Sequence, residues 1–308
     1  YLIGSLEYTI PYIARMPRLY NFIMGARPVR FALERVAGMV DSPLLSLIDF
    51  EAVCRRWGVQ IATAEQISAL KKEQRNRSVI LVQDAFTRYF ETPVLSDWIE
   101  LISRLGYQIY IAPFAPNGKP LQVQGFIRAF DKAAHFNAES LRQIQGYNVP
   151  LVGLDPAMTL VYRQEYAKTL GADKAPTVLL PQEWLVDVLP QSDEAKGTDT
   201  YYFLPHCTEK TNEPGSIGLW QKIYERMGLN LQVQASGCCG MSGTYGHETQ
   251  NAKTSDVIYG QSWGPLVKKF NQSGRLLADG YSCRSQVKRK EGVTILHPLQ
   301  ALLVTLRE

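Results

Sequence analysis

The chain lacks the features that mark a membrane-spanning or a nucleic-acid-binding protein. It has no run of about 18 consecutive apolar residues, so we expect no transmembrane segment. Its 33 basic and 29 acidic residues leave a net charge of +4 without a dense Lys/Arg block, which gives no reason to expect a nucleic-acid partner. The short basic run Lys288-Arg289-Lys290 is predicted to be a solvated helix face.

Nucleotide-binding and leader signals are missing as well. No G-x-G-x-x-G follows a predicted strand and no P-loop is present, so we do not expect the chain alone to oxidise a substrate. The sequence begins at Tyr1 without a basic, apolar and small-residue signal pattern. We therefore expect it to be a piece of a longer chain, whose remainder carries the substrate.

Cysteine is scarce and unevenly placed. Of five cysteines, Cys54 stands alone, and the other four lie in the last third of the chain, two of them adjacent. A secreted disulfide scaffold would be shorter and denser in cysteine. The pattern suits a reducing, cytoplasmic compartment in which thiols are kept for metal or redox chemistry, and Cys54 is predicted to be an ordinary core residue.

Residues 1–50, in the N-terminal part of an arm predicted over 1–76, are apolar, dotted with arginine and broken by Pro11, Pro17 and Pro28. We expect short helices with breaks between them, forming an arm that packs on the body of the chain or on a missing partner. A helix lying on a membrane surface, which would make the protein membrane-peripheral, is the alternative. Thr63 is predicted to cap a helix over 63–75.

From residue 78 onward, short apolar runs alternate with helical patterns. Strands are predicted over 78–82, 107–112, 150–154, 201–204, 229–234, 276–279 and 293–296. Helices are predicted over 93–105, 119–136, 138–145, 156–170, 216–227 and 250–271, and from Pro298. This alternation predicts an α/β fold of two tandem Rossmann-like parallel βαβ repeats. The polar segment from Gln191 to Asp199 divides them into a first repeat over 77–190 and a second over 191–308.

The short segments that follow the predicted strands occur in the same order in the two halves, which indicates an internal duplication. The matched segments are Gln83-Asp84-Ala85 with Pro205-His206-Cys207, Pro116-Asn117-Gly118 with Cys238-Cys239-Gly240, and Gly153-Leu154-Asp155-Pro156-Ala157-Met158 with Asp279-Gly280-Tyr281-Ser282-Cys283. Only the second copy carries cysteine at the three places.

Each cysteine position follows a predicted strand, and the carboxyl ends of parallel strands share one edge of a sheet. Cys207, Cys238, Cys239 and Cys283 are therefore expected to converge, and four thiolates suit an iron–sulfur cluster or Zn²⁺. The residues expected to support such a centre are Gly237 and Gly240 through backbone N–H groups, Lys210 and Arg284 through charge, and His206 and His247 as ligands or hydrogen-bond donors. Inert core cysteines and a disulfide or thiol-exchange site remain alternatives. His297 is predicted to be structural and His135 to be exposed or packed.

The runs from His206 to Lys210, Gly237 to Gly243 and Gly280 to Arg284 resemble the cysteine-rich CCG domain. That domain occurs in heterodisulfide reductase and in the iron–sulfur subunits of glycolate oxidase and anaerobic glycerol-3-phosphate dehydrogenase. The chain as a whole is similar to the C-terminal region of fused FAD-linked, iron–sulfur oxidoreductases of the YdiJ type, which are like D-2-hydroxyglutarate dehydrogenases.

The resemblance implies an electron-transfer region of a flavin-linked 2-hydroxy acid dehydrogenase. It implies that the four cysteines bind an iron–sulfur cluster of the 4Fe–4S type. It also implies FAD-binding and ferredoxin-like domains elsewhere in the full chain, and an electron acceptor that it does not identify. A structural zinc site in a docking domain and a metal-free thiol-redox domain are the other interpretations. The family's last motif is often Cys-x-x-Cys, whereas this chain has Cys283-Arg284-Ser285-Gln286, so one thiolate is absent.

Overall fold

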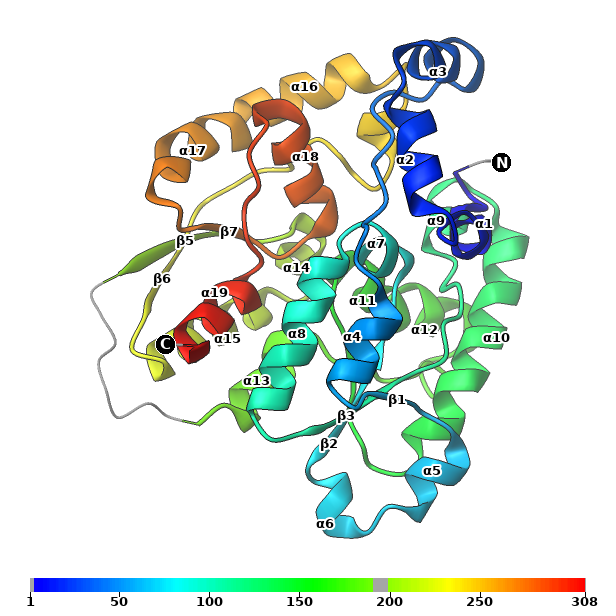
Figure 1. Cartoon of the computed structure of the whole chain (residues 1–308), viewed down its shortest axis with the longest axis vertical. Coiled ribbons are helices and arrows are strands. Elements are labelled where there is room, and N and C mark those ends of the chain that lie inside the picture. Colours follow the sequence, from blue (N-terminus) through cyan, green and yellow to red (C-terminus); the bar gives the residue numbers. More distant parts are fainter. Residues whose placement is uncertain (1–2, 191–198, 308) are drawn as a thin grey trace.

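Two parallel sheets, each made of short apolar strands, organise the protein (Figure 1). This computed structural model describes residues 3–190 and 199–307. The linker predicted from Gln191 to Asp199 lies outside the described residues, except for Asp199 itself.

The first sheet has the strand order β1-β3-β2-β4, all parallel. Its strands are β1 (Gln60–Ile61), β2 (Ser78–Val82), β3 (Gln108–Ile111) and β4 (Leu151–Gly153). All five residues of β2 are buried, because a central parallel strand is covered on both faces.

The second sheet repeats this arrangement with the order β6-β5-β7, again all parallel. Its strands are β5 (Thr200–Leu204), β6 (Asn230–Val233) and β7 (Leu276–Ala278). Parallel bridges from Val152 to Leu179 and from Leu277 to Leu296 extend the two sheets at equivalent edges. The predicted α/β fold with Rossmann-like parallel repeats is confirmed, but the strand predicted over 293–296 is reduced to the bridge at Leu296.

Helices fill the connections between the strands. In the first half they are α4 (Phe50–Arg56), α5 (Ala64–Ala69), α6 (Lys72–Arg75), α7 (Ala85–Tyr89), α8 (Thr92–Arg104), α9 (Lys119–Val123), α10 (Ile127–Gln145), α11 (Pro156–Arg163), α12 (Glu165–Leu170) and α13 (Pro181–Val188). In the second half they are α14 (Cys207–Asn212), α15 (Pro214–Arg226), α16 (Ala252–Gln261), α17 (Trp263–Phe270), α18 (Tyr281–Glu291) and α19 (Pro298–Arg307), with 3₁₀ turns η2 (Tyr245–His247) and η3 (Asn271–Ser273).

Several predicted helices are divided differently in the structure. Thr63 caps α5, as predicted, by accepting the N–H of Gln66 at 3.2 Å, but that helix ends at Ala69. The break predicted between 136 and 138 is wrong, because α10 runs through it. The chain breaks earlier instead, near Gly125, whose φ of +78° is left-handed and ends α9. The helices predicted over 156–170 and 250–271 each form two helices.

The two repeats exchange their last helices. α13, which ends the first repeat, packs on α15 of the second, and α19, which ends the second, packs on α8 of the first. Arg307 of α19 pairs with Glu100 of α8 at 2.6 Å, and Gln300 donates to Asp97 at 2.7 Å. One hydrophobic core runs through both sheets as a result, and it includes Trp98 and Ile99 of α8, Trp184 of α13, Trp220 of α15 and Leu302 of α19.

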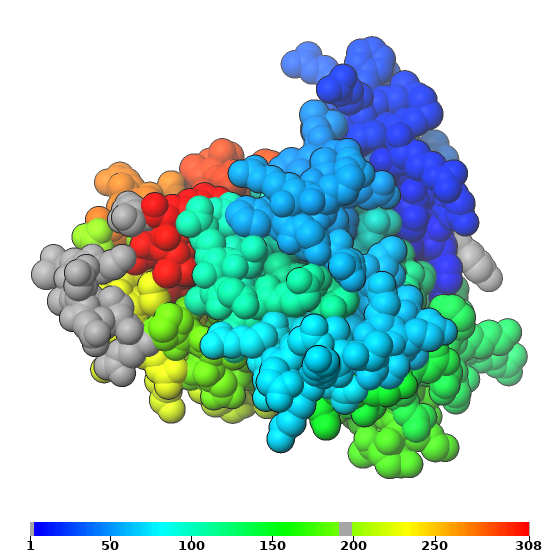
Figure 2. Space-filling view, turned by 60° about the horizontal axis from the view of Figure 1, so that its bottom comes forward, coloured from blue at the N-terminus to red at the C-terminus, as the bar shows by residue number. Residues whose placement is uncertain are grey.

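The N-terminal segment lies against one corner of the body. It comprises α1 (Leu6–Ile13), α2 (Pro17–Gly25), α3 (Arg27–Ala32) and the π-helix η1 (Leu33–Ala37). Figure 2 shows this segment, in blue, standing off the rest of the surface. None of the helices in the described ranges has the length and apolar character needed to cross a lipid bilayer.

Candidate functional site

The carboxyl edge of the second sheet brings the four predicted cysteines together. Cys207 opens α14 directly after β5, Cys238 and Cys239 lie in the loop after β6, and Cys283 lies in the first turn of α18 after β7. Their thiols interact in a row, from Cys207 to Cys238 to Cys239 to Cys283. Cys239 and Cys283 are buried, and Cys207 and Cys238 are half-buried. Cys54 lies on α4 against the hydrophobic core and takes no part.

The row of thiols favours one negative charge on Cys238. Its pKa is lowered because the Cys207 and Cys239 side chains hydrogen-bond to its sulfur, and because the N–H of Gly240 donates to that sulfur at 3.3 Å. The same interactions, together with burial, raise the pKa of Cys207 and of Cys239. Across the described ranges, no three or more His, Cys, Asp or Glu side chains are arranged so that they would already hold a metal ion. Metal binding here would therefore release protons from the neighbouring thiols.

The loop that carries Cys238 and Cys239 is seated tightly on α16. Gly240 has a left-handed φ of +86°, and a Cβ there would lie 2.4 Å from the carbonyl oxygen of Ser255. A Cβ on Gly246 would lie 2.8 Å from the Ser255 hydroxyl, which accepts a hydrogen bond from Gln286 at 3.0 Å. Glycine is required at these positions because the loop backbone touches the helix.

Two other predicted residues hold the loop at its start. The N–H of Gly237 donates to the Ser262 hydroxyl at 2.7 Å, so it is not available to a sulfur atom, and Trp263 donates to the Gly237 carbonyl at 3.0 Å. The Lys210 ammonium donates to the backbone carbonyl of Ser236. Of the two predicted glycine donors, only Gly240 bonds to sulfur.

The two histidines predicted beside the cysteines have other partners. His206 caps α14, accepting the N–H of Thr208 at 3.2 Å, and its other ring nitrogen lies 3.2 Å from the Ser282 hydroxyl. His247 is buried against the N-terminal segment, with Nδ1 3.0 Å from the Val40 carbonyl, and burial lowers its pKa. His206 therefore lines the site, whereas His247 faces away from it.

Of the two positive charges predicted near the cysteines, Lys210 acts on a thiol, because its charge opposes the rise in the pKa of Cys207, whereas Arg284 is paired elsewhere. Arg284 is only 3% exposed and forms an ion pair with Glu91 of the first repeat, while Nη1 donates to the Ala278 carbonyl at 2.9 Å. Of the basic run at the end of α18, Lys288 is exposed, as predicted. Arg289 is not part of a solvated face, because it bonds to Asp41 at 2.7 Å and to the Gly246 carbonyl at 2.6 Å.

The remaining histidines lie outside the site. His297 is fully buried, caps α19 by accepting the N–H of Leu299 at 3.1 Å, and packs edge-on against Trp220. This arrangement fits the predicted structural role. His135 is exposed on α10, as predicted.

The first repeat keeps the frame of the site without cysteine. Gly118 has a φ of +80°, matching Gly240, and its N–H donates to the Glu7 carboxyl at 2.8 Å. Glu7 is fully buried, and burial raises its pKa to about 8. Asp84 occupies the place of His206, and its pKa is raised to about 7 by burial and by the nearby Asp155. Two buried carboxyls with raised pKa values thus lie where the first repeat corresponds to the thiol site, one of them supplied by the N-terminal segment.

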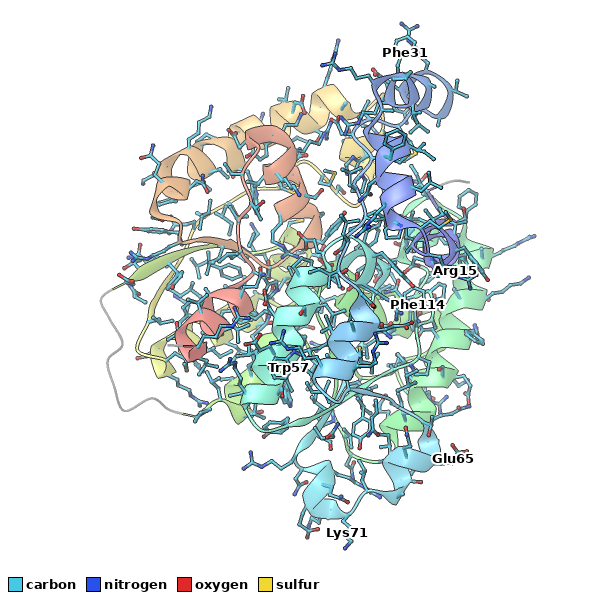
Figure 3. The ribbon with its side chains drawn as sticks, in the orientation of Figure 1. Arg15, Phe31, Trp57, Glu65, Lys71 and Phe114 are labelled. Carbon is cyan, nitrogen blue, oxygen red and sulfur yellow. The ribbon has the colours of Figure 1, made fainter. Side chains whose placement is uncertain are left out.

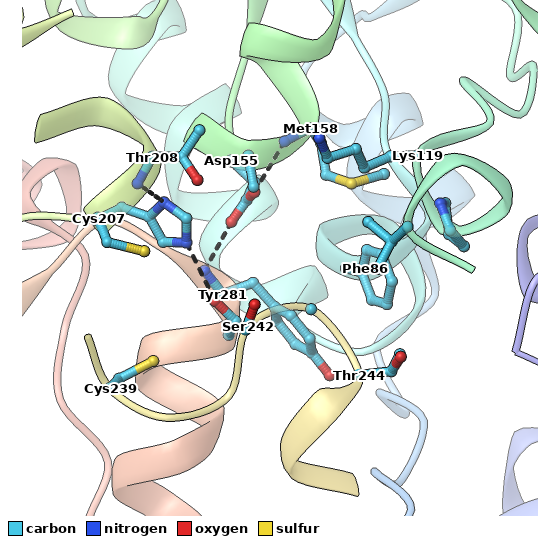
Figure 4. Close-up of a pocket in the computed structure, with 16 residues that line it drawn as sticks. Phe86, Lys119, Asp155, Met158, Cys207, Thr208, Cys239, Ser242, Thr244 and Tyr281 are labelled. Carbon is cyan, nitrogen blue, oxygen red and sulfur yellow. Dashed lines mark hydrogen bonds between the residues drawn. The ribbon is translucent and has the colours of Figure 1, made fainter. Parts of the chain in front are cut away.

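A cavity of about 220 Å³ lies between the two repeats, beside Cys207 and Cys239. Figure 4 shows both side chains on one wall and Phe86, Lys119 and Met158 of the first repeat on the other. Sequence reasoning missed these first-repeat residues, because strand periodicity does not show which loops face each other. The Asp155-Pro156 pair is a helix-start signal, but it does not reveal the hydrogen bond from the Tyr281 N–H to Asp155 across the cavity floor, at 2.7 Å.

Comparison with known proteins gives a consistent set of relatives. No protein-family model matches the chain. The chain is 54% identical over 303 residues to D-2-hydroxyglutarate dehydrogenase of Pseudomonas putida and 41% identical over 305 residues to that of Escherichia coli. Each match covers 98% of this chain but 30% of the relative, so the chain spans about a third of the length of these proteins. It is also 26% identical over 298 residues to a subunit of the anaerobic glycerol-3-phosphate dehydrogenase of Escherichia coli, a match that covers 92% of this chain and 71% of the relative.

Proposed function

We propose that this chain is the iron–sulfur electron-transfer region of a flavin-linked 2-hydroxy acid dehydrogenase. One observation carries the proposal: four thiols that are distant in sequence meet in a row at the carboxyl edge of the second sheet. The dehydrogenase relatives support an oxidoreductase role, and the substrate class is that of the D-2-hydroxyglutarate dehydrogenases.

The donor set fits an iron–sulfur cluster, of the 4Fe–4S type, because thiolates are the preferred ligands of such clusters. Cys207, Cys238, Cys239 and Cys283 would hold it, and it would supply one-electron transfer. The Gly240 N–H, which already bonds to the Cys238 sulfur, would stabilise the negative charge on sulfur. Burial of Cys239 and Cys283 keeps water from that side of the site.

The chain's partners follow from the same proposal. FAD, in a flavin-binding domain, would take the hydride from the hydroxy acid, and a ferredoxin-like domain would lie between the flavin and the cysteines. All five cysteines are free thiols, which suits a cytoplasmic location. The cavity beside Cys207 leaves the site accessible from the first repeat.

Metal analysis of protein prepared without oxygen tests the proposal. We expect iron and sulfide at about four each per chain, with an EPR signal on reduction, and loss of both in Cys238→Ser and Cys283→Ser. Cys54→Ser is the matched control and should keep the full iron content. Stoichiometric zinc that is insensitive to reductant would replace the proposal with a structural zinc site in a docking domain. Protein that takes up neither metal would leave a thiol-redox domain.

A further inference from the structure

The N-terminal segment exposes an unusual share of the protein's apolar surface. Of 18 large hydrophobic side chains that are exposed in the described residues, nine lie between Tyr8 and Val36. Phe22 is 79% exposed, Phe31 60% and Val36 89%. Single exposed apolar residues are normal, but such a concentration on one short segment marks an interaction surface.

The charged residues of the same segment are mostly arginine. Residues 3–38 contain Arg15, Arg18, Arg27, Arg30 and Arg35, but no lysine and no aspartate. The Arg15 guanidinium lies over the Tyr12 ring and that of Arg35 over the Phe31 ring, at 5.3 and 5.2 Å from the ring centres. Enrichment in Tyr, Phe, Met and Arg with depletion of Lys and Asp is the composition of protein–protein interfaces. We call this surface the arm face, defined by Tyr12, Met16, Phe22, Phe31, Val36 and the arginines among them.

The arm face also has a shallow, open apolar hollow. A hollow of about 450 Å³ is lined by Pro28, Val29, Ala32, Leu33, Val36 and Ala37, all from α3 and η1. Figure 3 shows Phe31 at the outer end of the segment, pointing away from the body. An apolar side chain of a partner could pack against this open hollow.

The arm face is fastened to the loop that carries the cysteines. The Val40 N–H donates to the His247 carbonyl at 2.8 Å, and the Thr249 N–H donates to the Gly38 carbonyl at 2.8 Å. Arg289 joins both sides, bonding to Asp41 and to the Gly246 carbonyl. Residues 247–249 belong to the same loop as Cys238 and Cys239, so a partner bound to the arm face is held at a fixed position relative to the thiols.

We infer that the arm face is the docking surface for the flavin-bearing part of the dehydrogenase, and this inference rests on the proposed function. The relatives have the additional length for such a part, because the chain covers 30% of them. The five arginines, opposed on this surface by Glu34, call for an acidic rim on the partner. A lipid surface fits less well, because the segment is divided into the separate helices α1, α2 and α3 of 8, 9 and 6 residues, whereas an interfacial anchor presents one apolar face along a single amphipathic helix.

A chimera tests the inference in an intact enzyme. The aligned segment of the Pseudomonas putida dehydrogenase is replaced by this chain, and hydrogen exchange of α2 and α3 is compared with that of the separate 308-residue chain. We expect backbone amides of the arm to exchange at least about 10-fold more slowly in the chimera. Phe22→Asp and Phe31→Asp should abolish this protection, whereas Phe136→Asp, on α10 and 70% exposed, should leave it unchanged.

Three outcomes would overturn the inference. The first is equal exchange of the arm in the chimera and in the separate chain. The second is flotation of the chimera with phosphatidylcholine–phosphatidylglycerol vesicles that Phe22→Asp abolishes, which would assign the arm face to a membrane. The third is concentration-dependent dimers of the separate chain that the same substitution abolishes. Exchange is read without metal or turnover, so a chimera that protects the arm but binds no iron would refute the iron–sulfur part of the proposed function and leave the docking surface standing.

Discussion

The carboxylate of Asp155, in the first repeat, accepts the backbone N–H of Tyr281, in the second, at 2.7 Å. Its other oxygen caps α11 by accepting the Met158 N–H at 3.1 Å. One buried side chain therefore begins a helix in the repeat without cysteines and fixes the start of α18, which carries Cys283.

Substitution of Asp155 tests this double role. Asp155→Ala removes a helix cap and leaves the Tyr281 N–H unpaired, so we expect the free energy of unfolding to fall by about 2–4 kcal/mol. Denaturant titration measures the change. Glu139→Ala, at an exposed position of α10, should change it by less than about 0.5 kcal/mol. An Asp155→Ala protein as stable as the control would contradict the assigned role.

The ion pair between Arg284 and Glu91 joins the two repeats, and we expect its burial to determine how much it contributes to stability. Arg284→Met leaves Glu91 and the Ala278 carbonyl without their buried partner, and we expect a loss of about 3 kcal/mol of stability. The control pair is Arg55 with Asp49, whose side chains are 69% and 65% exposed. Arg55→Met should cost less than about 1 kcal/mol. Similar losses from the two substitutions, measured by thermal and denaturant unfolding, would show that Arg284 is not a buried anchor.

Two glycines of the cysteine loop form a matched pair. Gly240 and Gly243 both have left-handed backbones, with φ of +86° and +67°, but only Gly240 contacts the Ser255 backbone. Gly243→Ala should cost about 1–2 kcal/mol through its backbone alone and keep the iron content. Gly240→Ala adds the clash, so it should cost about 1–3 kcal/mol more and lower iron binding. Equal iron content in the two variants would mean that the contact between Gly240 and α16 does not position the thiols.

The buried Glu7 carboxyl predicts an unusual pH dependence. Its pKa in the folded protein is raised to about 8 from 4.5, so the folded state holds a proton that the unfolded state releases between these values. Its contribution to stability is complete below pH 4.5 and is lost as the pH rises through 8. Glu7→Gln, which can still accept the Gly118 N–H, removes this loss.

Comparison of the wild type with Glu7→Gln isolates the effect, because the buried histidines are present in both proteins. We expect the stability of the wild type relative to the variant to fall from about pH 5 to about pH 9, by at most about 1.4 kcal/mol per pH unit. Denaturant titration at the two ends of this range and at neutral pH measures the difference. A difference that stays constant, or that grows in favour of the wild type, would mean that Glu7 is ionised in the folded protein.

The sequence was most informative where burial is complete. The central strand β2 matches its prediction over 78–82, because a strand covered on both faces is a continuous apolar run. The two exposed residues of β1 carry no such signal. α13 was not predicted, although Pro181 stands at its first position, where proline is favoured. The meeting of the four cysteines followed from the rule that parallel strands share one carboxyl edge.

The contact partners of the site residues could not be predicted from the sequence. His247 and Val40 are 207 positions apart, and Arg284 and Glu91 are 193 apart. Sequence spacing places a side chain on an element but does not say which distant element comes to meet it. His247 and Arg284 were therefore assigned to the cysteine site because they are near the cysteines in sequence, whereas in the structure they contact Val40 and Glu91.

The exchange of α13 and α19 between the repeats has a consequence for how the protein unfolds. A single copy cut from this chain would keep Trp98 against Trp184, or Trp220 against His297, but α8 or α15 would lose the helix that the other repeat lays on it. Because one hydrophobic core includes residues of both repeats, we expect them to unfold in a single transition.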